Sequence, residues 1–125
     1  QIGVSAWTAE ALKLTMPASV FSRSTECHNQ DKVSMGTIAA RDCLRILQLT
    51  DQVAAAHLVA TVQGVILRGR LKDGGNILSG ELEVFVDQVT HEFDFLEEDR
   101  PLEADLRRFV DMIQAKHWSL FEGAS

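Results

Sequence analysis

Tyrosine is absent from the sequence, and cysteine and proline occur only twice each. Two cysteines, Cys27 and Cys43, are too few for a disulfide framework, so we expect a reducing, cytoplasmic location. Basic residues are also scarce, because 12 Lys and Arg stand against 18 Asp and Glu, for a net charge of −6. This balance argues against nucleic acid or an anionic membrane surface as a partner.

The longest run without a formal charge covers residues 52–67. A membrane-spanning helix needs about 20 predominantly apolar residues, and this run is both shorter and interrupted by Gln52, His57, Thr61 and Gln63. The rest of the composition, 46% hydrophobic and 24% charged, is ordinary for a globular domain of 125 residues. The run therefore predicts a helix inside a large bundle.

The apolar residues recur at helical spacing in most of the chain, which predicts an all-α fold of about five helices. The expected helices cover residues 2–14, from about 29–34 to 49, 52–67, 79–93 and 101–113. The apolar faces expected of the last two are Leu82, Phe85, Val86, Val89 and Phe93, and Leu102, Leu106, Phe109, Val110 and Ile113. Because residues 35–49 carry apolar side chains on two faces, we expect that helix to be buried on most sides. Residues 68–76 are expected to form a loop.

Four sequence signals mark the expected helix ends. Pro17 closes the first helix, and Thr50-Asp51 is a natural N-cap for the third. Ser79 can cap the fourth helix, and Pro101 suits the first position of the fifth, followed by favourable acidic residues. Residues 89–95 also alternate between apolar and polar types, so a short strand is the alternative there.

The chain lacks an initiator methionine and begins in what is already a helical pattern. We therefore expect a single helical fragment of a longer protein. It divides into a truncated helix at residues 1–14, an irregular polar segment at 15–32 and helices over 33–117. The alternative is a free-standing helical interaction domain.

The polar stretch Ser24–Gly36 is the candidate functional site, because Glu26 to Lys32 are all polar or ionisable. Glu26 and Gln30 are four residues apart, so a helical turn would place both on one side. The spacing leaves two interpretations open. Either these residues form a site, or Ser24, Asn29 and Asp31 cap and brace the start of a helix.

Other chemistry is disfavoured by spacing. Glu26, Cys27, His28 and Asp31 are nearly consecutive, which is a poor pattern for zinc, so no metal is expected. Cys27 and His28 are adjacent and would point apart on a regular backbone, which argues against a nucleophile–base pair. Outside this stretch, we expect His57, His91 and His117 to be packing or surface residues and not ligands. Arg107 and Arg108 are expected to lie on a solvated helix face.

The chain resembles the C-terminal part of the aromatic amino acid ammonia-lyases, a family that includes histidine, phenylalanine and tyrosine ammonia-lyases and related aminomutases. The resemblance rests on four segments in order: Pro17–Val20 (PASV), Glu26–Gly36 (ECHNQDKVSMG), Val62–Arg68 (VQGVILR) and Asp99–Leu102 (DRPL). It implies a fragment of a large helical-bundle lyase, homotetrameric in its full-length form. The implied substrate is a small aromatic amino acid.

The resemblance also implies an electrophile, methylidene-imidazolone (MIO), which the family forms by cyclising an internal Ala-Ser-Gly tripeptide. The family's catalytic base is a tyrosine. This sequence contains neither Ala-Ser-Gly nor tyrosine. Both are therefore expected in another part of the full-length protein, and this fragment alone is expected to be inactive.

By the same resemblance, Glu26 and Gln30 are the catalytic residues of this segment. Glu26 matches the glutamate that phenylalanine lyases place beside the substrate amine. Gln30 matches a position where histidine lyases carry a glutamate for the imidazole, and this departure favours tyrosine or phenylalanine over histidine. Asn29 and His28 are expected to bind substrate or support the site. Histidine ammonia-lyase and an aminomutase remain the alternatives within the family.

Overall fold

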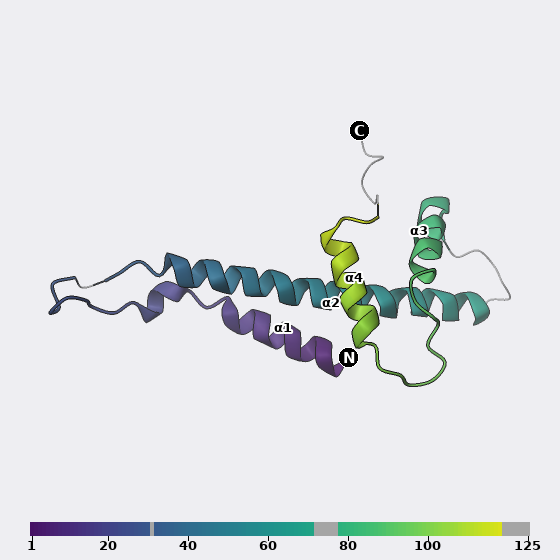
Figure 1. Cartoon of the computed structure of the whole chain (residues 1–125). Helices are drawn as coiled ribbons and strands as arrows, with labels where there is room; N and C mark the ends of the chain where they lie inside the picture. Colours follow the sequence, from purple (N-terminus) through teal and green to yellow (C-terminus); the bar gives the residue numbers. More distant parts are fainter. Residues whose placement is uncertain (31, 72–77, 119–125) are drawn as a thin grey trace. The chain divides into compact units, whose positions relative to one another are not determined.

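The structure is a computed structural model that describes residues 1–30, 32–71 and 78–118. These residues are all-α, as the sequence predicted (Figure 1). The elements in order are α1 (Ile2–Leu14), the 3-10 helix η1 (Ala18–Phe21), α2 (Gly36–Leu71), α3 (Gly80–Thr90) and α4 (Glu103–Gln114). The chain forms two compact units, Gln1–Val53 and Ala54–Ser125, and α2 contributes to both.

Helix α1 has the predicted bounds and ends before the Met16-Pro17 pair. Its face of Val4, Trp7 and Leu14 is half-buried, whereas Ile2 is 89% exposed. The helix lies alongside the first part of α2 (Figure 1), and the Arg45 Nε donates to Glu10 Oε1 at 2.8 Å. This ion pair lowers the pKa of the Glu10 carboxyl from its usual value.

The predicted break at Thr50-Asp51 is wrong, because α2 continues without interruption from Gly36 to Leu71. The Thr50 hydroxyl does not cap a new helix. Instead it donates to the Ile46 carbonyl one turn back, at 2.9 Å. No glycine or proline occurs between positions 37 and 63 to interrupt the helix. The loop prediction is wrong for Arg68–Leu71, which is helical, and its remaining residues, 72–76, lie outside the described residues.

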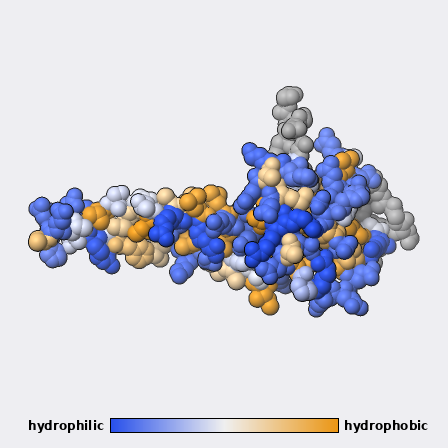
Figure 2. Space-filling view, viewed as in Figure 1, coloured by the Kyte–Doolittle hydropathy of each residue, from blue (hydrophilic) through white to orange (hydrophobic). Residues whose placement is uncertain are grey.

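The prediction that residues 35–49 are buried on most sides is also wrong for this chain. Ile38, Leu44 and Leu47 are 47%, 62% and 56% exposed. Among the described residues of Gln1–Val53, the buried apolar side chains are Ala18 and Leu49. Figure 2 accordingly shows apolar side chains at the surface between polar ones.

The second unit has a continuous apolar core built from α2, α3 and α4. Its buried members are Ala55, Val59, Val62, Val89, Phe93 and Phe109. The Phe109 ring meets Phe93 edge-on at 5.9 Å between centroids and stacks on Trp118 at 6.0 Å. Most residues of the two predicted apolar faces pack in this core, namely Phe85, Val86, Val89 and Phe93, and Leu106, Phe109, Val110 and Ile113. Leu82 is instead 51% exposed.

The predicted ends of α3 and α4 are partly correct. Ser79 occupies the N-cap position of α3, but its side chain makes no capping hydrogen bond. Helix α4 begins at Glu103 and not at Pro101, which precedes the N-cap residue Leu102. Its first turn carries the expected acidic residues. The strand alternative for residues 89–95 is wrong, because α3 runs to Thr90 and turns follow it.

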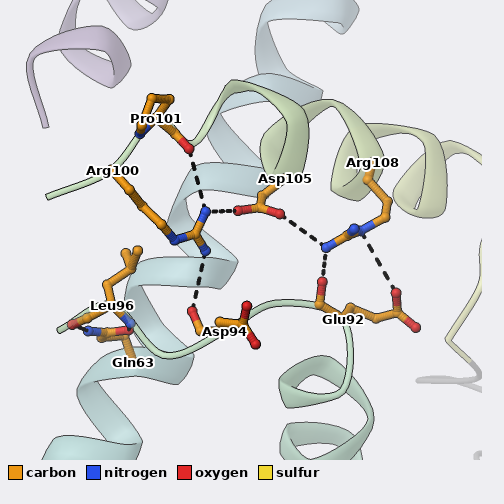
Figure 3. A network of polar contacts seen from close by, with 8 residues as sticks. All are labelled: Gln63, Glu92, Asp94, Leu96, Arg100, Pro101, Asp105 and Arg108. Atoms are coloured by element: carbon orange, nitrogen blue, oxygen red, sulfur yellow. Dashed lines mark hydrogen bonds and ion pairs between the residues drawn. The ribbon is translucent and has the colours of Figure 1, made fainter. Parts of the chain in front are cut away.

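The side chain of Gln63 joins α2 to the segment between α3 and α4. The Gln63 amide donates to the Leu96 carbonyl at 2.8 Å, and its Oε1 accepts from the Leu96 N–H at 3.1 Å (Figure 3). Both polar backbone groups of Leu96 are thereby satisfied. The Arg70 guanidinium also lies 4.0 Å from the Phe95 ring centroid.

Asp105 joins the same segment to α4. Its carboxylate accepts from Arg100 Nη1 at 2.6 Å and from Arg108 Nη2 at 3.1 Å, and Arg108 Nη2 also donates to the Glu92 carbonyl (Figure 3). The bond from Arg100 holds the pKa of Asp105 below its usual value of 3.8, with Arg108 adding to the effect. Arg107 pairs with Glu103 at 2.8 Å on the exposed face of α4.

Candidate functional site

The polar segment of the first unit forms a tight turn between Thr25 and Gln30. The Thr25 N–H donates to the Gln30 carbonyl at 3.1 Å, and the Asn29 N–H donates to the Glu26 carbonyl at 3.0 Å. Both central residues of the inner turn, Cys27 and His28, have positive φ, at 54° and 63°, as in a type I′ turn. The residues therefore form a hairpin-like bridge, which the sequence did not predict.

This geometry corrects the argument from helical spacing. Glu26 has a φ of 44° and so lies in the left-handed region, together with the two residues that follow it. Glu26 and Gln30 consequently do not share the side of a right-handed helical turn. Gln30 is instead the bridge partner of Thr25, and Glu26 opens the inner turn.

A second pair of hydrogen bonds closes the segment nearer its base. The Ser22 hydroxyl donates to the Val33 carbonyl at 3.0 Å and accepts from the Val33 N–H at 2.9 Å. The Gly36 N–H at the start of α2 donates to Ser34 Oγ at 3.3 Å. Ser34 therefore braces the helix start. Ser24, which was a candidate for that role, faces the turn.

The side chains of the turn bond to one another across it. Ser24 Oγ and His28 Nδ1 lie 2.7 Å apart, and the Thr25 hydroxyl donates to Gln30 Oε1 at 3.0 Å. The four predicted site residues, Glu26, His28, Asn29 and Gln30, are exposed. The turn thus gathers one carboxylate, one imidazole and two amides on a short closed loop.

The side chain of Arg23, two residues before the turn, bonds to the backbone outside this loop. The Arg23 guanidinium donates to the carbonyls of Phe21 and Ser22, at 3.2 and 3.0 Å. Within residues 1–30, 32–71 and 78–118, no three His, Cys, Asp or Glu side chains converge as metal ligands. Asp31, a member of the consecutive set considered for zinc, lies outside the described residues. Both cysteines, Cys27 on the turn and Cys43 on α2, are free and exposed.

The chain's own residues do not provide the electrophile that the family resemblance implies. The sequence has no Ala-Ser-Gly to cyclise. Glu26, His28, Asn29 and Gln30 are exposed on the turn, so they do not enclose a prosthetic group.

The first unit also has an open groove of about 260 Å³ between α1 and α2, away from the turn in sequence. It is lined by Glu10, Leu14, Ile38, Arg41, Asp42 and Arg45, so it contains none of the predicted site residues. The histidines outside the turn, His57, His91 and His117, are exposed, which confirms their expected surface position.

Sequence reasoning missed Thr25 and Ser22 as parts of this turn. Both are hydroxyl residues placed just before the polar run, and their partners lie 5 and 11 residues further along. A hairpin pairing of the segment would have found them. The helical spacing that we applied could not.

The sequence profile described as "Aromatic amino acid lyase" matches residues 1–90, which include α1, the turn, α2 and α3. The chain belongs to the aromatic amino acid lyase family.

Known members of the aromatic amino acid lyase family resemble the chain over most of its length. The histidine ammonia-lyase of Desulfotalea psychrophila is 35% identical over 115 residues, 92% of this chain and 22% of that protein. The tyrosine ammonia-lyase of Cereibacter sphaeroides is 38% identical over 103 residues, 82% of this chain and 19% of that protein. The histidine ammonia-lyase of Rattus norvegicus is 43% identical over 61 residues, 49% of this chain and 9% of that protein.

The chain spans about a fifth of the length of the first two relatives. The family match favours a lyase fragment over the alternative of a free-standing interaction domain. Among the residues described, none of the helices combines the length and the apolar content that a membrane crossing requires.

Proposed function

We propose that the full-length protein containing this chain is an ammonia-lyase that acts on an aromatic L-amino acid, with tyrosine or phenylalanine preferred. The reaction breaks the Cα–N bond and removes a proton from Cβ, which leaves ammonia and an aryl acrylate. The observation that carries the substrate preference is Gln30, a neutral amide on the polar turn where histidine lyases are expected to carry a carboxylate.

Glu26 is the residue proposed to act on the departing amine. Its carboxylate is exposed at the start of the inner turn, where a substrate can reach it. A carboxylate beside the amine stabilises positive charge there and can exchange a proton with the nitrogen as the C–N bond breaks. The base that takes the Cβ proton is proposed to be the tyrosine that the family resemblance implies, which lies outside this chain because the chain contains no tyrosine.

Gln30 is proposed to contact the substrate through its amide. The Thr25 hydroxyl donates to Gln30 Oε1, so in this arrangement the NH2 group is the end that meets a ligand. An amide donor suits a carboxylate or phenol oxygen, but it carries no charge to pair with an imidazolium and cannot act as a base. Asn29 and His28 are proposed to support these two residues, because they complete the same turn.

The substrate assignment is tested with the full-length protein and three amino acids. Tyrosine, phenylalanine and histidine are supplied separately, and coumarate, cinnamate and urocanate are followed by their near-ultraviolet absorbance. We expect coumarate or cinnamate to form faster than urocanate. Formation of urocanate alone would refute the preference for tyrosine or phenylalanine.

The role of Glu26 is tested by Glu26→Gln, with Glu97→Gln as a control at another exposed glutamate. Removal of an acid–base group typically costs 10²–10⁴-fold, so we expect turnover to fall by roughly a hundredfold or more. The control should retain wild-type turnover, and both variants should unfold at the wild-type temperature. Unchanged turnover in Glu26→Gln would make Glu26 a structural residue.

Histidine is the second candidate substrate. The relatives from D. psychrophila and R. norvegicus, both similar to this chain, are named histidine ammonia-lyases. Under this alternative Gln30 would contact a neutral imidazole as a donor. The same three-substrate assay separates the two candidates.

We also propose that the full-length protein is a cytoplasmic homotetramer. The exposed leucines of α2, Leu44 and Leu47, support the proposal, because apolar side chains in a helix face of this kind are suited to burial against further chain. The two free cysteines are compatible with a reducing compartment. Sedimentation of the full-length protein tests the oligomeric state, and a monomer would contradict it.

A further inference from the structure

Thr25 and Gln30 face each other across the turn through two separate hydrogen bonds. One joins their backbones, from Thr25 N–H to Gln30 carbonyl at 3.1 Å. The other joins their side chains, from the Thr25 hydroxyl to Gln30 Oε1 at 3.0 Å. Side chains of directly opposed residues in an antiparallel bridge are close neighbours, so the second contact follows from the first.

The side chains of Thr25 and Gln30 differ in conformational freedom. Thr25 is half-buried and β-branched, with a single χ angle that is restricted by its branching, whereas Gln30 is exposed and has a long, flexible side chain. A flexible glutamine loses considerable rotamer entropy when it is ordered. The contact with Thr25 orders it before any ligand arrives. In this pair Thr25 is therefore the anchor and Gln30 the side chain that is held.

We propose that Thr25 is a positioning residue, whose hydroxyl holds the Gln30 amide so that its NH2 group is presented to an oxygen acceptor of the substrate. The proposal rests on the proposed function, in which Gln30 contacts the substrate. Thr25 itself touches no reacting atom. Loss of its hydroxyl should weaken substrate binding, because the substrate would then have to order Gln30.

The test compares Thr25→Val, which removes the hydroxyl at nearly constant shape, with Thr25→Ser, which keeps it. Thr61→Val serves as the control at an exposed threonine of α2. One hydrogen bond of this kind corresponds to a roughly threefold to tenfold change. In the full-length enzyme we expect Thr25→Val to raise KM by that factor with little change in kcat. Thr25→Ser and Thr61→Val should match the wild type.

A merely structural role for Thr25 would give a different pattern. It would lower kcat through a smaller folded fraction and would do so equally in a Gln30→Ala background. If Thr25 acts through Gln30, the double variant Thr25→Val/Gln30→Ala should bind substrate no worse than Gln30→Ala. An equal loss from Thr25→Val in both backgrounds, or a failure of Thr25→Ser to restore KM, would overturn the proposal.

A structural readout separates this proposal from the proposed function. Crystal structures of the full-length wild type, Thr25→Val and Thr25→Ser show the Gln30 amide directly, whatever the substrate. We expect the amide to leave its wild-type position in Thr25→Val and to keep it in Thr25→Ser. An unmoved Gln30 in Thr25→Val would overturn the positioning role, whereas absence of turnover of aromatic amino acids by the wild type would overturn only the function.

Discussion

The two compact units of the chain differ in where their apolar side chains lie. In Ala54–Ser125, three helices share a core that contains the fully buried Phe109 and Val89. In Gln1–Val53, the buried apolar residues described are Ala18 and Leu49, and large side chains such as Leu44 remain exposed. The second unit therefore contains its own source of stability, and the first unit has little of it.

The polar side chains also have different roles in the two units. The second unit uses its polar side chains to fasten the segment between α3 and α4, through Gln63 and Asp105. The first unit gathers exposed polar side chains on the turn between Thr25 and Gln30, where they bond only across the turn itself in the contacts described. The stabilising core and the candidate site therefore lie in different units of this chain, so substitutions should affect stability and activity separately.

The largest expected difference in unfolding free energy comes from replacing one phenylalanine by alanine in each unit. Phe109→Ala empties a fully buried site and should cost about 3–5 kcal/mol of unfolding free energy. Phe21→Ala removes a ring that is 53% exposed and should cost less than about 1 kcal/mol. Thermal or denaturant unfolding measures both. An equal loss of unfolding free energy at Phe21 and Phe109 would contradict the difference in stability between the two units.

A second test concerns Gln63. Gln63→Ala removes the partner of the N–H and carbonyl of the half-buried Leu96. Each such hydrogen bond contributes about 1 kcal/mol, so the loss of both should cost about 2 kcal/mol of unfolding free energy. The control Gln88→Ala, at an exposed position of α3, should change stability by less than about 0.5 kcal/mol. Denaturant unfolding gives both values. Equal effects would mean that the segment after α3 does not depend on this contact.

A third test uses pH. The pKa of Asp105 is lowered in the folded state by Arg100 and Arg108, so its stabilisation is complete above its ordinary pKa of 3.8 and is lost as pH falls through the lowered folded-state value. Asp105→Asn should therefore cost about 1.5 kcal/mol at pH 7, and this difference should shrink towards zero in acid.

The matched control for the pH test is Asp87→Asn. Asp87 pairs with His91 at 3.5 Å, but its side chain is 73% exposed. An exposed pair of this kind contributes little, so we expect no measurable loss at pH 7. A penalty for Asp105→Asn that stays constant from pH 7 into acid would contradict the role of its charge.

The smallest expected effect lies in the turn. Cys27 adopts a φ of 54°, which glycine adopts without the steric cost of a Cβ atom. Cys27→Gly should raise the unfolding free energy by about 0.5 kcal/mol, because the relief of strain exceeds the added flexibility of the unfolded chain. Cys43→Gly, in the interior of α2, should instead lower it by about 0.5 kcal/mol. The same sign at both cysteines in differential scanning calorimetry would contradict the left-handed turn.

The fold class and much of the core were predictable because they depend on local periodicity. The spacing of apolar residues located α1, α3 and α4 and picked out Phe93 and Phe109 as core residues. The failure at Thr50 has a definite cause. A threonine hydroxyl can cap a new helix or bond back within an existing one, and sequence alone does not choose between them.

The candidate site was predictable only in part. Family resemblance identified its residues, but its geometry depends on pairing across a turn. The polar run from Glu26 to Lys32 marked a segment that the structure folds in part as a tight turn, and its role as a site stays a prediction. The bridge between Thr25 and Gln30 depends on three successive residues that adopt positive φ. None of them is a glycine, so the sequence gives no signal for this conformation. Helical spacing was therefore the wrong rule for this segment, and the roles of Glu26 and Gln30 stay predictions.

The two exposed thiols have a practical consequence for experiments. Cys27 lies at the tip of the turn and Cys43 on the first part of α2, and both are free. Thiol-reactive spin labels can therefore be attached to natural residues of this chain on either side of the Ser22–Val33 closure. The electron–electron distance between the labels would report opening of the turn directly. The segment proposed to contact the substrate thus contains a natural labelling site, Cys27, for distance measurements.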